Sequence, residues 1–400
     1  MIRTALKSPS ILVAVRIGFG GLAFSLGNLM FAESLPVAEF TVIVLIMAIS
    51  QIAMSTGPLG ADTLVNRTSG VPAPEAWFKV LANCALVAFL LSSAAGYYYD
   101  FDISSASILF VICFGCGMNQ FASAVYQSKQ DFRKSQWIRQ IHNVIFLLAA
   151  AATVWLGLAD ALPAILAIAA GYILVPYLVW GRLTSGSDRS DTPNESSDIK
   201  WDDGYSIVAN TLATIMLATL ERLSIPSLLG GKELATFAVL AAISGAPFKI
   251  LQTGIRFTLL PRLRATQDKR EVRHILAHES AISGAATFAS CIAVMIVTPI
   301  IIEHFFAEKY SLDTGLIIAA LFGGIGKVLS SFTTVVTTSL GAKSELQKLN
   351  FWSWISLAVA IIAAIGGSTY GLTGLVYGVS IGWYVYSLAG LALSLKYIVD

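Results

Sequence analysis

The stretch GRLTSGSDRSDTPNESSDIKWDD (Gly181–Asp203) interrupts the chain near its middle and decides how the rest is interpreted. Every other polar stretch is shorter and lies between apolar runs of membrane-spanning length. About 180 residues precede it and about 200 follow it, and each side holds six apolar segments. We therefore interpret it as a solvated cytoplasmic connector, residues 181–203, between an N-terminal lobe (1–180) and a C-terminal lobe (204–400).

The composition indicates a membrane protein. Only 12% of the 400 residues are charged, whereas 56% are hydrophobic. Soluble globular proteins carry roughly 25% charged residues. Long apolar runs predict helices of about 20 residues that cross the membrane, and they disfavour a β-barrel, whose strands alternate in pieces of about ten. The expected fold class is an all-α polytopic membrane protein with about twelve transmembrane helices in two six-helix lobes.

Twelve apolar segments define the expected spans. The first contains Arg16 and lacks a signal-peptidase site, so we interpret it as an uncleaved span. The expected spans lie near residues 11–31, 37–57, 78–99, 104–127, 138–157, 161–180, 204–228, 233–255, 275–299, 312–339, 351–366 and 372–395.

The distribution of Lys and Arg predicts the orientation. If the N-terminus is cytoplasmic, 20 of these residues fall in cytoplasmic segments and only Lys232 and Lys309 fall outside, with four more inside spans. Cytoplasmic loops of membrane proteins are enriched in Lys and Arg, so we expect both termini in the cytoplasm. Seven of the eight tryptophans lie near expected span ends, as interfacial anchors do: Trp77, Trp137, Trp155, Trp180, Trp201, Trp352 and Trp354.

The two halves resemble weak repeats. A shift of 197 residues places VAEF (Val37–Phe40) on LATF (Leu234–Phe237) and Gly57 on Gly254. Six spans is an even number, so the repeats would share one orientation. Parallel repeats pack about an axis along the membrane normal, with a cavity between them.

Ionisable residues inside spans are the candidate site residues, because buried charge in a bilayer is costly and usually faces a cavity or a partner. They include one acid, Glu221, and four cations: Arg16, Arg222, Lys249 and Lys327. Arg256, just beyond the end of the span that contains Lys249, is a further candidate.

Helical spacing aligns several of these residues with polar neighbours. Lys249, Gln252 and Arg256 share one face of their span. Lys327 begins a second stripe that continues with Ser331, Thr334 and Thr338. Such walls predict a cavity that favours an anionic ligand, especially phosphate.

The same residues also have explanations other than ligand binding. Arg16 and Arg256 are close enough to a span boundary for their charges to reach the interface. Glu221 and Arg222 point about 100° apart, so they need not pair with each other. A salt bridge to another helix accounts for each of them as well as ligand binding does.

Other motifs do not predict a catalytic or metal site. His274 and His278 have metal-ligand spacing but lack an evident third ligand, and a basic helix entrance explains them better. The four cysteines lie inside spans and are expected to be buried free thiols. We find no nucleophile–base set and no phosphate-binding loop with a Walker lysine, so neither an enzyme nor an ATP-driven pump is expected. No nucleic-acid partner is expected, since topology explains the basic loop Arg262–Arg273.

One feature concerns helix packing. Gly367, Gly371, Gly374, Gly378 and Gly382 form a smooth stripe that permits close approach of a neighbouring helix.

Several segments together resemble bacterial polysaccharide flippases (O-antigen, Wzx-type) of the multidrug/oligosaccharidyl-lipid/polysaccharide (MOP) exporter superfamily. The strongest is LERLSIPSLLGGKELATFAVLAAI (Leu220–Ile243), followed by LLPRL (Leu259–Leu263). Weaker ones are LPVAEF (Leu35–Phe40) and QSKQDFRKSQW (Gln127–Trp137). The chain departs from the family pattern at Glu221, where the family often has Asp.

The resemblance implies transfer of undecaprenyl-diphosphate-linked oligosaccharide across the bacterial inner membrane by alternating access, for surface polysaccharide and lipopolysaccharide biosynthesis. Expected partners are this lipid-linked glycan, the bilayer, and a glycan polymerase or glycosyltransferases. No cofactor is expected. A proton or sodium gradient, or the membrane potential, would drive net flow, with Glu221 the candidate for coupling.

Two other functions stay open. A drug or cation exporter of the same superfamily would need acids in its cavity, and the excess of buried cations argues against it. A non-transporting scaffold of a glycan-synthesis complex is the second.

Overall fold

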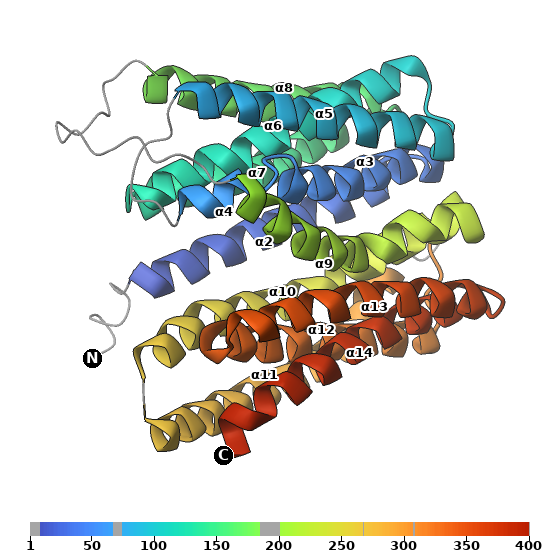
Figure 1. Ribbon diagram of the computed structural model, residues 1–400. Coiled ribbons are helices and arrows are strands. Elements are labelled where there is room, and N and C mark those ends of the chain that lie inside the picture. Colours follow the sequence, from blue (N-terminus) through green and yellow to red (C-terminus); the bar gives the residue numbers. More distant parts are fainter. Residues whose placement is uncertain (1–8, 67–73, 185–200, 267, 307–308, 400) are drawn as a thin grey trace. The chain divides into compact units, whose positions relative to one another are not determined.

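The computed structural model describes residues 9–66, 74–184, 201–266, 268–306 and 309–399, and within these ranges it contains helices and no strands (Figure 1). A polytopic all-α membrane protein is the fold class expected from the sequence, and it is confirmed. The helices are α2 (Pro9–Ser34), α3 (Val37–Thr56), α4 (Ala61–Val65), α5 (Pro74–Tyr99), α6 (Ile103–Ser128), α7 (Phe132–Leu156), α8 (Leu162–Thr184), α9 (Trp201–Leu228), α10 (Gly231–Ala265), α11 (Lys269–Phe305), α12 (Thr314–Leu340), α13 (Lys343–Ser368) and α14 (Gly371–Val399).

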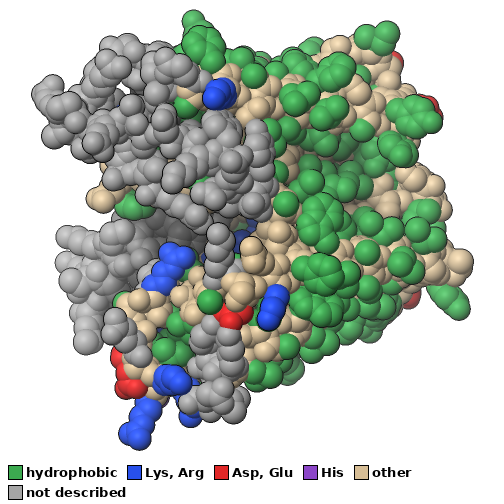
Figure 2. Space-filling view, viewed as in Figure 1, with side chains coloured by type: hydrophobic (Ala, Val, Ile, Leu, Met, Phe, Trp, Pro, Cys, Tyr) green, Lys and Arg blue, Asp and Glu red, His purple; other side chains and the backbone are tan. Residues whose placement is uncertain are grey.

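Within the described residues, ten of these helices are long and apolar enough to cross a membrane: α3, α5 to α8 and α10 to α14. Hydrophobic side chains accordingly cover much of the surface visible in Figure 2, where they would face lipid. For α2 and α9 the expected spans remain predictions.

Two helices greatly exceed the length that a bilayer core requires. α10 has 35 residues and α11 has 37, whereas a bilayer core needs about 20. The segment between residues 256 and 274, expected as a loop, is therefore mostly helical. Leu259, Leu263 and Val272 are buried in this segment, and α10 and α11 contact each other.

The chain divides into two compact units. One, called here the amino unit, comprises Met30–Thr219, and the other, the carboxyl unit, comprises Met1–Leu29 together with Leu220–Asp400. Both boundaries fall inside helices, α2 and α9. The expected division at residues 181–203 remains a prediction, because residues 185–200 lie outside the described ranges.

Aspartate caps begin several helices. Asp131 accepts a hydrogen bond from the Lys134 N–H at 3.0 Å at the start of α7, and Asp313 accepts one from the Gly315 N–H at 3.2 Å at the start of α12. These bonds satisfy N–H groups that have no partner inside the helix. Gly157, with a φ of 63°, ends α7 in the left-handed region that a residue with a side chain rarely adopts.

The amino unit is packed around an aromatic core at the end of α6. Trp77 is buried there, with its ring 4.7 Å from Phe121 and 4.8 Å from Trp180, both edge-on. Interfacial anchoring is therefore the wrong explanation for Trp77, because its ring fills the core instead of facing the headgroups. Trp155, by contrast, is 85% exposed, as an interfacial anchor would be. The cysteine prediction is confirmed for Cys84, Cys113 and Cys116, which are buried free thiols, and Cys291 is half-buried.

The short helix α4 was not expected from the sequence. Its Leu64 and Val65 pack into the same aromatic core, while the Asp62 carboxylate accepts a hydrogen bond from the Gln120 side chain at 2.9 Å. Burial raises the pKa of Asp62, although Gln120 and the charge of Arg139 act in the opposite direction.

We therefore expect a pH-dependent stability difference between the wild type and Asp62→Asn. Because the pKa of Asp62 is raised in the folded protein, the contribution of this residue to stability is fully present at pH values below its ordinary pKa of 3.8. That contribution is lost as the pH rises through the pKa of the folded state. The side chain of the Asp62→Asn variant is uncharged at all pH values, so its melting temperature should lack the decrease that the wild type shows as the pH rises. Melting curves recorded between about pH 4 and pH 8 measure the difference.

Asp131→Asn is the control of opposite sign. Partial burial acts to raise the pKa of Asp131, but the Lys134 N–H and ammonium outweigh it, so the pKa lies below its ordinary value. Its contribution is therefore present above the ordinary pKa and lost as the pH falls. If Asp62→Asn and the wild type had parallel melting profiles, the buried carboxylate would not have the assigned role.

The carboxyl unit shows the close packing expected from the glycine stripe. A Cβ atom on Gly374 would overlap the carbonyl oxygen of Gly367, and one on Gly378 would overlap that of Ala363. α13 and α14 thus approach closely enough for their backbones to touch, which only glycine permits.

Gly378→Ala is therefore expected to lower the free energy of unfolding by about 1–3 kcal/mol, since overpacking forces the backbones apart. Gly366→Ala is the matched control, because a Cβ there meets no atom within 4 Å. The two melting temperatures in detergent make the comparison. A Gly378→Ala protein as stable as the control would contradict the packing assigned to this stripe.

Candidate functional site

The described candidate residues lie on three helices of the carboxyl unit. Glu221 and Arg222 are on α9, Lys249 and Arg256 on α10, and Lys327 on α12. Arg16 is on α2, but its side chain lies outside the described part of the structure.

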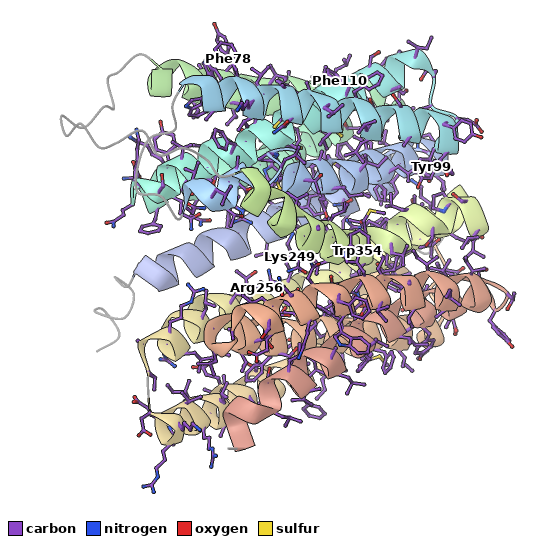
Figure 3. The ribbon with its side chains drawn as sticks, in the orientation of Figure 1. Phe78, Tyr99, Phe110, Lys249, Arg256 and Trp354 are labelled. Atoms are coloured by element: carbon purple, nitrogen blue, oxygen red, sulfur yellow. The ribbon has the colours of Figure 1, made fainter. Side chains whose placement is uncertain are left out.

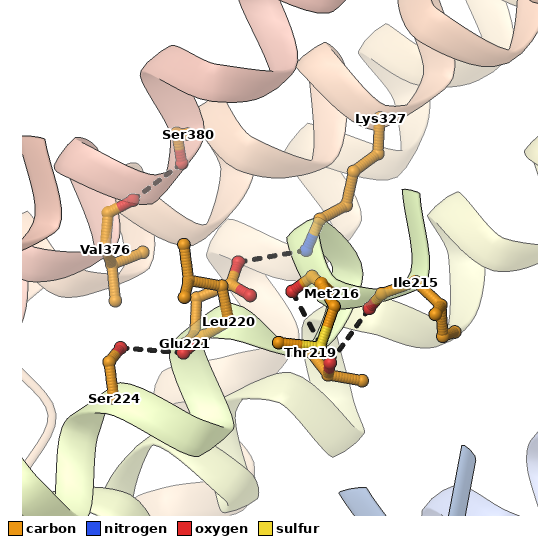
Figure 4. Close-up of polar contacts among 9 residues, drawn as sticks. All are labelled: Ile215, Met216, Thr219, Leu220, Glu221, Ser224, Lys327, Val376 and Ser380. Atoms are coloured by element: carbon orange, nitrogen blue, oxygen red, sulfur yellow. Dashed lines mark hydrogen bonds and ion pairs between the residues drawn. The ribbon is translucent and has the colours of Figure 1, made fainter. Parts of the chain in front are cut away.

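The structure pairs Glu221 with Lys327. The Lys327 Nζ atom lies 3.1 Å from the Glu221 Oε1 atom and donates a hydrogen bond to it (Figure 4). The Glu221 residue is only 4% exposed. The salt bridge to another helix, left open by the sequence, is therefore the arrangement observed for Glu221.

A glycine-rich run of α12 positions Lys327. In LFGGIGK (Leu321–Lys327), a Cβ on Gly324 would meet the Phe248 ring of α10, and one on Gly326 would lie 3.1 Å from the Cβ of Trp383 on α14. The absence of side chains at these positions lets α12 pack directly against both neighbours. Lys327 is consequently held beside Trp383, with its Nζ atom 5.7 Å from the ring centroid.

Two hydroxyls of the polar stripe that follows Lys327 already donate hydrogen bonds within α12. Ser331 donates a hydrogen bond to the Lys327 carbonyl at 3.0 Å, and Thr338 donates one to the Thr334 carbonyl at 2.8 Å. Such bonds are the usual state of Ser and Thr inside helices. In this conformation these two hydroxyls can therefore accept hydrogen bonds from a ligand but do not have a spare proton to donate.

Lys249 and Arg256 lie about two turns apart on α10 (Figure 3) and are exposed in the carboxyl unit. The Lys249 Nζ atom lies 5.9 Å from the ring centroid of Phe24 on α2, a cation–π contact. Arg222 is half-buried on α9. Their role in substrate binding remains a prediction.

The charges of these helices do not cancel. Lys327 pairs with Glu221, and α9, α10 and α12 together carry seven Lys and Arg residues but only four Asp and Glu residues. A helix bundle with this excess attracts anions and repels cations.

The histidine pair does not assemble a metal site. The rings of His274 and His278 stack with their centroids 6.4 Å apart, and Glu279 pairs with Arg262 on α10. Within the described ranges, no three His, Cys, Asp or Glu residues are placed to hold a metal ion together.

Sequence reasoning missed Trp383 and Phe24, the aromatic partners of Lys327 and Lys249. It also missed the glycine run of α12, whose position just before a lysine inside an apolar span was an available signal. Neither aromatic partner could be found from local spacing, because each is on a helix distant in the sequence.

Comparisons with known proteins detect similarity in structure only. No protein-family model matches the sequence, and no curated protein matches it. An inward-facing multidrug resistance MATE family transporter of the MOP superfamily has a TM-score of 0.70 and 13% identity, covering 97% of this chain and 98% of its own. Lipid II flippase MurJ, in an inward closed conformation, has a TM-score of 0.74 and 12% identity, covering 96% and 87%. The straight conformation of a MATE protein has a TM-score of 0.61 and 13% identity, covering 97% and 95%.

These alignments extend over nearly the whole chain, so the likeness concerns the complete helix arrangement and not one shared motif. At 12–13% identity it establishes the fold. The chain therefore has the fold of transporters of the MOP superfamily.

Proposed function

We propose that the protein is a transporter, not an enzyme, that flips a polyprenyl-diphosphate-linked oligosaccharide across the bacterial cytoplasmic membrane for surface polysaccharide biosynthesis. The fold alone leaves the substrate open, since one similar structure is a lipid II flippase and another a multidrug resistance transporter. The observation that favours the anionic substrate is the excess of positive charge on α9, α10 and α12.

The charge pattern separates the two substrate classes. A diphosphate gains charge-assisted hydrogen bonds from Lys and Arg side chains. A cationic drug needs an available carboxylate, but Glu221 is already paired with Lys327. The prenyl chain would stay in the lipid, because transferring a long hydrocarbon into a polar path is unfavourable.

The transport cycle we propose is alternating access between a cytoplasm-facing and a periplasm-facing state. Reorientation requires the loaded headgroup to bind one state better than the other. A proton or sodium gradient or the membrane potential would supply the driving force, and a glycan polymerase and glycosyltransferases would be functional partners.

A deletion strain tests the substrate class. We expect loss of surface polysaccharide and accumulation of the lipid-linked glycan on the cytoplasmic leaflet, both reversed by a plasmid copy of the gene. Unchanged surface polysaccharide combined with increased sensitivity to cationic drugs would instead identify a drug exporter.

Both termini are proposed to be cytoplasmic, because this orientation places 20 of 22 loop cations inside. In a background without the four native cysteines, Asp102→Cys should react with an impermeant thiol reagent added from the periplasm. Ser190→Cys should not react until the membrane is permeabilised. The opposite labelling pattern would reverse the topology.

A further inference from the structure

We propose that Lys327 is a tethered counter-cation that occupies the Glu221 carboxylate and excludes Na⁺ and other solute cations from it. The inference builds on the proposed transport function only in its consequence for energy coupling. Its evidence is the ion pair itself, which joins α9 to α12 across 106 residues of sequence.

A buried carboxylate requires a compensating charge. Glu221 is 4% exposed, so an unpaired negative charge there would lose its hydration without replacement. The group can be compensated by a side-chain cation, by a proton or by a solute cation. The structure supplies the first, with the Lys327 ammonium 3.1 Å from Oε1.

The neighbouring guanidinium does not take this place. Arg222 follows Glu221 on α9 and interacts with it electrostatically, but its side chain leaves the helix about 100° away. Of the two cations, Lys327 is the one that forms the ion pair.

Lys327 is also held in position independently of Glu221. Its ammonium lies 5.7 Å from the Trp383 ring centroid, within the range of a cation–π interaction. The glycines of Leu321–Lys327 fix α12 against α14 and so limit the directions the side chain can take. An ammonium restrained in this way has a high effective concentration at the carboxylate.

The consequence is selective. A sodium ion in solution has to compete at this carboxylate with an ammonium that is attached to the chain and already lies 3.1 Å from Oε1, so Glu221 is unavailable to it. Removing the ammonium exposes the carboxylate to solute cations. Lys327 thereby determines whether this acid can bind a cation at all, and it points to a driving force that does not act through Na⁺ binding at Glu221.

The experiment measures cation-dependent melting of the purified protein. NaCl is varied against choline chloride at constant ionic strength for the wild type, Lys327→Met, Glu221→Gln and the double variant. We expect no Na⁺-specific shift for the wild type. The melting temperature of Lys327→Met should rise with the logarithm of the Na⁺ concentration, and the double variant should not respond, because the carboxylate is gone.

A second cation probes the shape of the vacated space. Lys327→Ala should be stabilised by methylammonium chloride, which restores the amine head group, while Lys327→Ala combined with Glu221→Gln should not be. Choline chloride is the matched salt, since its bulky quaternary head group cannot donate a hydrogen bond.

Two results would overturn the inference. One is a Na⁺-specific stabilisation of the wild type that Glu221→Gln abolishes, a measurement that requires no lysine variant to fold. The other is a folded Lys327→Met protein with no cation response. Neither result would contradict the proposed anionic substrate, because the substrate class is tested by flipping assays and not by Na⁺ binding.

Discussion

Lys327→Met is expected to lower the free energy of unfolding by about 3–5 kcal/mol, the largest stability effect we predict. The substitution leaves Glu221 buried without its ion-pair partner. Glu221→Gln should cost less, because an amide needs less compensation than a carboxylate and can still hydrogen-bond to Lys327. The double variant should be more stable than Lys327→Met alone, since it contains no unpaired carboxylate.

A double-mutant cycle measures this coupling by thermal or chemical unfolding in detergent. The Arg262–Glu279 pair is the matched control, because 57% of the Arg262 side chain is exposed. Breaking it with Arg262→Met should change stability by less than about 1 kcal/mol. Additive effects of the Glu221 and Lys327 substitutions would show that the two residues are not energetically coupled.

Lys249→Met is expected to reduce transport of the diphosphate-linked glycan by about 10- to 100-fold. A hydrogen bond to a charged group contributes about 1.5–3 kcal/mol, and 1.4 kcal/mol corresponds to a tenfold change in affinity. Lys249→Arg should retain most of the activity, because it preserves the charge. The rate of substrate flipping in proteoliposomes measures the effect.

Lys232→Met is the control for this substitution, since Lys232 is an exposed cation at the other end of the same helix. Melting temperatures identify any variant whose loss of activity reflects unfolding. A normal flipping rate for Lys249→Met would contradict a role of Lys249 in substrate binding.

The fold was predictable because lipid imposes a simple pattern. Each backbone group in the hydrocarbon must be satisfied within its own helix, so apolar length alone defines the spans. The expected segment 104–127 corresponds to α6, Ile103–Ser128, and 372–395 corresponds to α14, Gly371–Val399. The pattern failed at α4 and at the extensions of α10 and α11, where burial is not set by apolar length alone.

The candidate site was predictable only as a set of residue types. The sequence identified Glu221 and Lys327 as charged residues inside spans, because a charge within an apolar run is conspicuous. Their pairing was not predictable, since it depends on how α9 and α12 pack. The hydroxyls of Ser331 and Thr338 show the same limit. Sequence spacing predicted that they share one helix face, but it did not predict the hydrogen bonds that they donate within α12.

The central claim, an anionic lipid-linked substrate, is tested most directly with purified protein in proteoliposomes. A prenyl-diphosphate oligosaccharide and an uncharged prenyl oligosaccharide are presented on one leaflet, and their appearance on the other leaflet is followed by enzymatic accessibility. Export of a cationic dye is measured in parallel. We predict rapid flipping of the diphosphate-linked glycan, slower flipping of the uncharged analogue and no dye export. Dye export without flipping of the diphosphate-linked glycan would contradict the account.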